Sequence, residues 1–385
     1  MVLDREFPPD MRVENEIDCL VKNGHSVHIA CYTRKNKPLL EIYKDYTIHR
    51  KKISSFIYKS SIGCLQFPFY FNFWKSFVFE IVQKYKIDVI HIHDLPLAKV
   101  GNEVKKKYRI PFIVDLHENW PAYLRISSHT QGLFGKTLSN NIQWIDYEKK
   151  YTSLADRVIV VVEEAKTRLE KIIENGEKIV IVSNTINLKE ISDLEYKPDN
   201  NFITLFYGGG INFHRGLQSV IQAMGQIVLQ NKNVRFWIVG DGSYKSELEE
   251  MSKKLNLTEQ IKFFGFKPYK EMLDLLSQSD IALIPHLVSD HTNSTIPHKL
   301  FQYMFYEKPI VASECEPIKR ILIETNTGLT YNPDNVEELS SLILDIANNP
   351  EEYSYLKKNG KLWVNKKYNW KFDQDYLLKL YESLS

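Results

Sequence analysis

Residues 203–216 read ITLFYGGGINFHRG, a short apolar run that ends in three glycines and leads to Arg215. The apolar run predicts a buried strand over 203–207, and the pattern that follows predicts a helix over 216–229. Glycines between a strand and a helix let backbone amides approach a phosphate, and Arg215 could donate two hydrogen bonds to diphosphate oxygens. The alternative is a tight turn without a ligand, and the presence of Arg215 favours the interpretation as a phosphate site.

The same alternation of apolar runs and helical patterns occurs in both halves of the chain, which predicts parallel sheets joined by crossover helices. In the first half, strands are expected at 27–31, 89–93, 112–116, 158–162 and 179–182. In the second half, they are expected at 203–207, 234–239, 261–264, 281–285, 310–312 and 329–331.

Length sets the number of domains, because 385 residues are too many for one ordinary core. We therefore predict an α/β protein of two Rossmann-like domains, with mostly parallel sheets facing across a cleft. The domains are expected at 1–187 and 188–367, and a helix over 368–385 is expected to return to the first domain. A strand should precede the helix capped by Asp10, and Met1–Leu3 supplies only its end, so the start of the chain is expected to be trimmed or mis-assigned.

Composition indicates a reducing, aqueous compartment. The four cysteines are scattered without metal-ligand spacing, so neither a disulfide framework nor a zinc site is expected. The three residues before Asp4 are followed at once by charged ones, which argues against a signal peptide. The most apolar stretch, 62–82, is interrupted by polar residues and is a poor candidate to span a bilayer. The sequence therefore predicts a cytoplasmic protein.

Positive charge and aromatic side chains gather in one segment of the first half. Residues 50–109 hold 12 basic and 4 acidic residues, and 50–79 combine lysines with many aromatic side chains. This composition suits an element that inserts into lipid headgroups while its charges contact anionic lipid. Packing into the core is an equal alternative, and no nucleic-acid fold signature accompanies the charge. We expect a peripheral position at the inner face of the membrane and no nucleic-acid partner.

Two further clusters in the second half follow predicted strands, where doubly wound sheets bind ligands. Gly240 lies in one glycine turn, although a tight capped connection explains that turn equally well. The other cluster is a polar loop over 289–295, which leads to a helix predicted over 297–306. Lys299 in its first turn works against the helix dipole, a small cost that is reasonable if an anion binds there. A surface helix with an unspecialised lysine is the alternative.

Histidines and acids close two predicted strands of the first half. His93 and Asp94 end one strand, and His117 and Glu118 follow another. Histidines this close together could indicate a metal, but no third ligand has a convincing spacing. We therefore expect no metal site.

Taken together, these residues resemble the retaining family 4 glycosyltransferases of the GT-B fold over essentially the whole chain. In the first half, the likeness is carried by DREFPPDMRVENE (4–16), NGHSV (23–27), DVIHIH (88–93), His117 and ADRV (155–158). In the second half, it is carried by GGINFHRG (209–216), VGDG (239–242), FGF (264–266), SDIALIP (279–285) and KPIVAS (308–313). Each motif is weak alone, and their order and spacing make the assignment specific.

The resemblance implies roles for individual residues. Arg215 stands where the family places a lysine that holds the donor diphosphate, and His117 matches the histidine that contacts the donor sugar. The predicted donor-side residues also include Gly209, Gly210, Gly240, Phe266, Lys267, Ser294, Thr295, Ile296, Pro297 and Gln302. The predicted acceptor-side residues are Asp10, Arg12, His93, Asp94 and Glu118.

The chain departs from the family pattern at three positions. The family's arginine five residues before the lysine is Gly210 here, and its Glu-x7-Glu pair aligns with Ser294 and Gln302. Gln302 can still hydrogen-bond a ribose, whereas Ser294 is a shorter, neutral group. Lys299 is expected to replace the lost arginine as a point charge on phosphate.

These observations predict a retaining glycosyltransferase of hexosyltransferase type. It is expected to move a sugar from a nucleotide sugar, UDP-linked by family expectation, to a lipid-linked or polysaccharide acceptor in cell-surface polysaccharide synthesis. Arg215 and Lys299 would stabilise the negative charge that develops on the departing diphosphate, with no metal or other cofactor. The alternative is a non-catalytic protein of the same fold that binds a nucleotide or a partner, motivated by Ser294 and Gln302. A nucleotide-sugar epimerase is a third reading.

Overall fold

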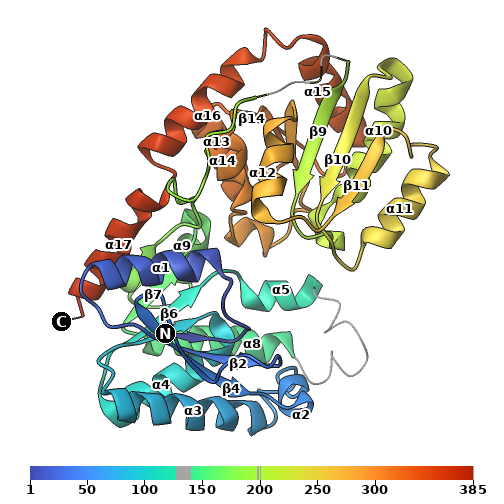
Figure 1. Cartoon of the computed structure of the whole chain (residues 1–385). Helices are drawn as coiled ribbons and strands as arrows, with labels where there is room; N and C mark the ends of the chain where they lie inside the picture. Colours follow the sequence, from blue (N-terminus) through green and yellow to red (C-terminus); the bar gives the residue numbers. More distant parts are fainter. Residues whose placement is uncertain (127–139, 197–198, 200, 385) are drawn as a thin grey trace. The chain divides into compact units, whose positions relative to one another are not determined.

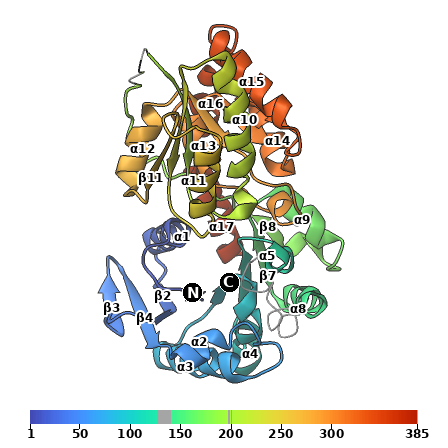
Figure 2. The same cartoon turned by 90° about the vertical axis from the view of Figure 1, so that its right-hand side faces the viewer.

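The computed structural model describes residues 1–126, 140–196, 199 and 201–384. Contacts divide the chain into two compact units, Met1–Asn184 with Asp373–Ser385, and Thr185–Phe372. The sequence predicted boundaries at 187 and 367. Each unit is an α/β layer structure in which helices cover both faces of one sheet (Figures 1 and 2).

The first unit is built on an eight-stranded sheet of order β3-β4-β2-β1-β5-β6-β7-β8. Every neighbouring pair runs parallel except the edge pair β3–β4. Its strands are β1 (Val2–Leu3), β2 (His28–Thr33), β3 (Leu40–Tyr43), β4 (Tyr46–Lys52), β5 (Ile90–His93), β6 (Phe112–Leu116), β7 (Arg157–Val160) and β8 (Ile179–Ile181). Its helices include α1 (Met11–Lys22), α2 (Ser55–Lys59), α3 (Phe69–Tyr85), α4 (Ala98–Tyr108), α5 (Trp120–Ile126), α8 (Asn141–Leu154), α9 (Glu163–Glu170) and most of α17 (Trp370–Glu382).

The second unit has a six-stranded, wholly parallel sheet of order β11-β10-β9-β12-β13-β14. In this doubly wound order, ligands bind beyond the carboxyl ends of the strands, near the point between β9 and β12 where the order reverses. The strands are β9 (Ile203–Gly208), β10 (Val234–Val239), β11 (Ile261–Gly265), β12 (Ile281–Ile284), β13 (Ile310–Ser313) and β14 (Gly328–Tyr331). The helices are α10 (Leu217–Gln230), α11 (Lys245–Lys254), α12 (Tyr269–Ser277), α13 (Lys299–Phe305), α14 (Glu316–Thr325), α15 (Val336–Asn348) and α16 (Ser354–Lys366).

The predicted α/β fold class is confirmed, and so is the N-cap of α1. The Asp10 carboxylate accepts a hydrogen bond from the Val13 backbone N–H at 3.2 Å. The prediction of Pro297 in the first turn of α13 was wrong. The Pro297 carbonyl accepts from the Leu300 N–H in a single tight turn, and the regular helix begins at Lys299.

The basic aromatic segment divides between core and surface. Tyr70, Phe71, Trp74 and Phe77 of α3 are buried, as the core-packing alternative expected. Other aromatic side chains of α2, α3 and the turn between them remain exposed. None of the described helices combines the length and the apolar content needed to cross a membrane.

Candidate active site

The second unit gathers the predicted donor-side residues at the carboxyl edge of its sheet. These residues lie on loops that follow four neighbouring strands, so the loops meet at one edge. The loops hold Gly209 and Gly210 after β9, Gly240 after β10, Phe266 and Lys267 after β11, and Ser294, Thr295, Ile296 and Pro297 after β12, and Gln302 lies in α13, the helix that follows the last of these loops.

Two cationic side chains stand together at this edge. Arg215 ends the short helix that follows β9, and Lys299 opens α13. The Lys299 Nζ lies 3.6 Å from the centroid of the Tyr207 ring. It also lies against Gly209, whose φ is +142° and where an added Cβ would stand 2.7 Å from the Lys299 Nζ. A glycine at 209 therefore makes room for the ammonium.

Neither cation is neutralised by the protein that the structure describes. Within residues 1–126, 140–196, 199 and 201–384, no carboxylate forms an ion pair with Arg215 or Lys299. The Lys299 Nζ and the Arg215 Nε are buried without a hydrogen-bond partner among those residues. Burial, and next the charge of Arg215, hold the pKa of Lys299 well below its ordinary value. Arg215 is therefore a charge without a carboxylate partner among the described residues, and an anion bound here would favour the charged form of Lys299.

Three neutral histidines surround this pair. The His286 Nε2 lies 3.2 Å from the Arg215 Nη1. Burial and the charges of Arg215 and Lys299 lower the pKa of His286 far below its usual range. Burial and Arg215 likewise lower the pKa of His214 to about 4 and that of His291 to about 3. Sequence reasoning gave these histidines no role, although His214 and His286 each follow a strand of the predicted sheet.

Gln302 is buried, and its amide orientation is fixed by two neighbours. Its Nε2 donates to the Tyr269 hydroxyl at 3.1 Å and lies 3.1 Å from the His298 Nδ1. Burial lowers the pKa of His298 to about 4, so this nitrogen can accept a hydrogen bond. Both amide protons are thereby engaged, which leaves the Oε1 as the group that can bind a ligand hydroxyl. Ser294 instead donates to the Asp290 carbonyl at 2.7 Å.

The first unit places predicted acceptor-side residues at the carboxyl edge of its own sheet. Arg5 joins two of them, with its Nη2 2.6 Å from Asp94 and its Nη1 3.2 Å from Asp10. The His117 Nε2 lies 3.0 Å from Asp115, and its Nδ1 lies 3.7 Å from Asp94. Burial opposes the charge on His117, but Asp115 and Asp94 outweigh it and raise the pKa of His117 to about 9. His117 is therefore an imidazolium at neutral pH.

Arg12 and His93 lie inside the first unit rather than on an exposed face. Both are buried. The Arg12 Nη2 is 3.1 Å from each oxygen of Asp115, and its Nη1 donates to the Val182 carbonyl at 2.9 Å. Internal contacts therefore engage both Nη atoms of Arg12, which has a predicted acceptor-side role. Glu118 is half-buried beside His117.

Four buried side chains of this unit could hold a metal ion by their donor atoms: Glu16, His91, His93 and Asp115, with one atom of each within 4.8 Å of the others. Sequence reasoning noted histidines and acids at the ends of β5 and β6 but found no third ligand with a convincing spacing, and Glu16, which lies on α1, was not considered. Arg12 already contacts both acids, with its Nε 3.2 Å from Glu16. Burial and Asp115 raise the pKa of Glu16 to about 8, so Glu16 keeps a proton at neutral pH. The cluster is thus balanced by Arg12 and a proton, and we assign no metal to it.

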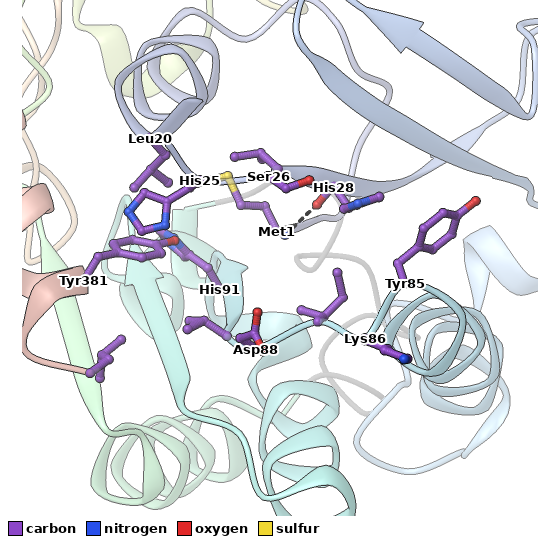
Figure 3. Close-up of a pocket in the computed structure, with 14 residues that line it drawn as sticks. Met1, Leu20, His25, Ser26, His28, Tyr85, Lys86, Asp88, His91 and Tyr381 are labelled. Carbon is purple, nitrogen blue, oxygen red and sulfur yellow. Dashed lines mark hydrogen bonds between the residues drawn. The ribbon is translucent and has the colours of Figure 1, made fainter. Parts of the chain in front are cut away.

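A cavity of about 360 Å³ lies at the opposite edge of the first sheet, at the starts of β1, β2 and β5 (Figure 3). Histidines, a tyrosine of α17 and the amino-terminal group face it. The Tyr381 hydroxyl lies 2.9 Å from the His91 Nδ1, and the Met1 amine donates to the His28 carbonyl at 2.7 Å. None of the predicted site residues lines this cavity.

Comparison with known proteins agrees with the architecture. Residues 11–190 match the family Glycosyltransferase Family 4, and residues 188–363 match the family Glycosyl transferases group 1. An uncharacterised glycosyltransferase of Methanocaldococcus jannaschii is 28% identical over 307 residues, which cover 80% of this chain and 78% of the relative. An alpha-monoglucosyldiacylglycerol synthase of Acholeplasma laidlawii is 23% identical over 294 residues, which cover 73% of this chain and 72% of the relative. The structure of Anabaena HepE in complex with UDP superposes with a TM-score of 0.71 at 14% identity and covers 99% of each chain.

Two doubly wound units in one chain, each with polar side chains at the carboxyl ends of parallel strands, have the architecture of the GT-B fold. The chain belongs to the glycosyltransferases of GT4 type, because its first half matches Glycosyltransferase Family 4 and its second half matches Glycosyl transferases group 1. The predicted family is confirmed.

Proposed function

We propose that the protein transfers a hexosyl group from a UDP-sugar to an acceptor hydroxyl, with retention of the anomeric configuration. The pairing of Arg215 and Lys299 carries this proposal. Arg215 and Lys299 are basic side chains without a carboxylate partner among the described residues, and a diphosphate has the charge and the oxygens to engage both and to restore the proton of Lys299. The UDP complex of the Anabaena protein supports UDP as the nucleotide.

Charge accounts for the chemistry of the step. The bond from the anomeric carbon to the phosphate oxygen breaks, and its electron pair goes to the departing diphosphate. The acceptor oxygen forms the new bond on the same face of the sugar, and its proton passes to a diphosphate oxygen. Arg215 and Lys299 stabilise the charge that develops there, so neither a metal nor a separate base is required.

Other residues bind and orient the donor. The Gln302 Oε1 accepts from a ribose hydroxyl, because its amide protons are engaged by Tyr269 and His298. Phe266, whose side chain is 78% exposed, offers its ring to the base. For the first unit, we assign His117 a hydrogen bond from its protonated ring to a hydroxyl of the transferred sugar.

The acceptor is proposed to be lipid-linked and reached at an anionic membrane surface. Phe56, Phe67 and Phe69 are 64%, 49% and 45% exposed, and the Phe69 ring contacts the other two. Lysines lie on the same elements, including Lys59 at the end of α2. Exposed rings beside lysines bind where acyl chains meet anionic headgroups. The Acholeplasma relative, whose name describes synthesis of a glucosylated diacylglycerol, supports this class of acceptor.

A donor screen tests the proposal. The protein is incubated with UDP-, GDP- and ADP-sugars, with and without a lipid acceptor in vesicles, and the released nucleotide is measured. We expect release from at least one UDP-sugar, none above background with Arg215→Ala, and a product that keeps the donor's anomeric configuration. The absence of nucleotide release from every donor, with and without acceptor, would contradict the proposal.

One observation favours a second candidate, a non-catalytic nucleotide-binding member of the fold. Ser294 stands where the family has a glutamate, and its hydroxyl is directed to the Asp290 carbonyl. In that case, calorimetry would show tight UDP binding, and no donor would be turned over in the screen, with or without acceptor.

A further inference from the structure

His286 holds the Arg215 guanidinium, and neither the sequence nor the family likeness gives it a role. It follows β12 directly and is 2% exposed. Among the described residues, its Nε2 is the one hydrogen-bond partner of the Arg215 side chain, at 3.2 Å from the Nη1. An arginine only donates, so the Nε2 must accept and the proton of the ring must be on the Nδ1. The contact therefore requires a neutral imidazole.

Backbone contacts also hold the segments that carry Arg215 and His286 next to each other. Residues 214–216 and 285–287 lie against each other, with the Leu287 N–H donating to the His214 carbonyl at 3.0 Å. Gly216 has a φ of +69°, and a Cβ there would stand 1.7 Å from the Pro285 carbonyl oxygen. The Ser313 hydroxyl donates to the His286 carbonyl. The ring of His286 is thus held in register with Arg215.

Two other arginines, the buried Arg12 and the half-buried Arg168, are held differently. Arg12 is bound by the Asp115 carboxylate, and Arg168 is bound by both oxygens of Glu148 at 2.7 and 2.8 Å. A carboxylate orients a guanidinium but also neutralises it. An imidazole with an open lone pair orients the group and leaves its charge intact.

We propose that His286 is a positioning residue that fixes the Arg215 guanidinium at the diphosphate site while preserving its full positive charge for the ligand. This proposal rests on the proposed function, because it assigns the ligand of Arg215 as a nucleoside diphosphate. His286 itself contacts no substrate in this account. The neutral state of its ring is the property on which the role depends.

Two substitutions of nearly the same shape, His286→Gln and His286→Glu, separate the orientation of the Arg215 guanidinium from its net charge. His286→Gln keeps a neutral acceptor at this position, and His286→Glu replaces it by a carboxylate that orients Arg215 but neutralises it. The affinities for UDP and for uridine are measured by calorimetry at pH 8 for both variants, the parent and Arg215→Ala. Uridine lacks the diphosphate and reports whether the nucleoside site is intact.

We expect His286→Gln to bind UDP within about threefold of the parent. His286→Glu should weaken UDP binding about 10- to 100-fold, as Arg215→Ala does, which corresponds to the loss of one charge-assisted contact. Uridine affinity should stay within about twofold in all of them. His286→Phe, which removes the acceptor without adding charge, should weaken UDP binding by less than Glu does and gives a second comparison with Gln if the Glu variant does not fold.

Equal UDP affinities for His286→Gln and His286→Glu would overturn the proposal, as would an equal loss in Gln and Phe. If Arg215→Ala bound UDP as the parent does, the diphosphate assignment under the proposed function would itself be wrong. If Arg215→Ala weakened binding and His286→Glu did not, only the role of His286 would fail.

Discussion

At the scale of single residues, the main feature of the second unit is a pair of basic side chains, Arg215 and Lys299, with no carboxylate partner among the described residues. Both side chains lie at the carboxyl edge of the sheet. The Arg215 Nε and the Lys299 Nζ are buried without a hydrogen-bond partner among the described residues, and a bound anion would accept a hydrogen bond from each. Gly209 contributes by lacking a side chain, since any Cβ there would meet the Lys299 Nζ. The sequence indicated both cations, whereas the neutral ring that orients Arg215 could be found only once β9 and β12 were adjacent.

Lys299 should change its protonation when a diphosphate binds. Burial and Arg215 depress the pKa of Lys299 in the free protein, and a bound anion raises it again. Between the depressed and the restored pKa, binding therefore takes up a proton, and UDP affinity falls as pH rises through that window toward the ordinary lysine value of about 10.4.

Calorimetry at pH 8 in two buffers of different ionisation enthalpy measures this uptake. The parent should show a buffer-dependent binding enthalpy that corresponds to net proton uptake. Lys299→Met, which keeps the length without the charge, should show none beyond that of UDP itself. Identical proton uptake in the parent and the variant would contradict the assignment.

Arg12 has a structural role that its place in the family motif did not reveal. Its guanidinium contacts both oxygens of the buried Asp115. Arg12→Met should cost about 3–5 kcal/mol of unfolding free energy, because it leaves that carboxylate short of a buried partner. Urea denaturation at pH 7 measures the loss, and Lys254→Met, which removes an exposed pair with Glu250, serves as a control that should leave stability essentially unchanged. A loss as small as that of the control would show that Arg12 is not needed to stabilise Asp115.

At the scale of elements, the sequence predicts the strands whose positions are determined by a local run of apolar residues. The expected strands occur within one or two residues of their predicted bounds, because apolar runs of that length bury both faces in a parallel sheet. The β3–β4 hairpin was missed, since its turn uses Lys44 at a φ of +52° and carries no glycine signal. Its second strand contains Arg50, which is buried because it pairs with Glu41 at 2.6 Å and donates to the Phe7 carbonyl. The contact of Arg50 with Phe7, 43 residues away, leaves no periodic trace in the sequence.

The exposed rings of α2 and α3 should govern attachment to lipid. Replacing Phe56, Phe67 and Phe69 together by Ser removes apolar surface worth about 1.5–3 kcal/mol for each ring that is fully buried in the membrane interface. We expect binding to vesicles with anionic lipid to fall at least about tenfold, as measured by co-sedimentation. Leu229→Ser, at an exposed position of α10, should bind as the parent does. Equal binding by the triple variant and the parent would place the membrane contact elsewhere.

At the scale of the whole molecule, both units use one rule: polar side chains follow the carboxyl ends of parallel strands. That rule allowed the sequence to predict the loops of the site. It could not predict the contacts between them, such as that of Arg12 with Asp115, 103 residues apart, or of Arg215 with His286, 71 residues apart. Contacts of this kind follow from strand order, which the sequence does not display.

The central claim is that Arg215 and Lys299 together bind a nucleoside diphosphate, and the affinity difference between UDP and uridine tests it most directly. The parent should bind UDP at least about 100-fold more tightly than uridine, since two charge-assisted contacts contribute. Arg215→Ala and Lys299→Met should each reduce that preference about tenfold or more, and the double variant should nearly abolish it without weakening uridine binding. A double variant that still prefers UDP as strongly as the parent does would contradict the account.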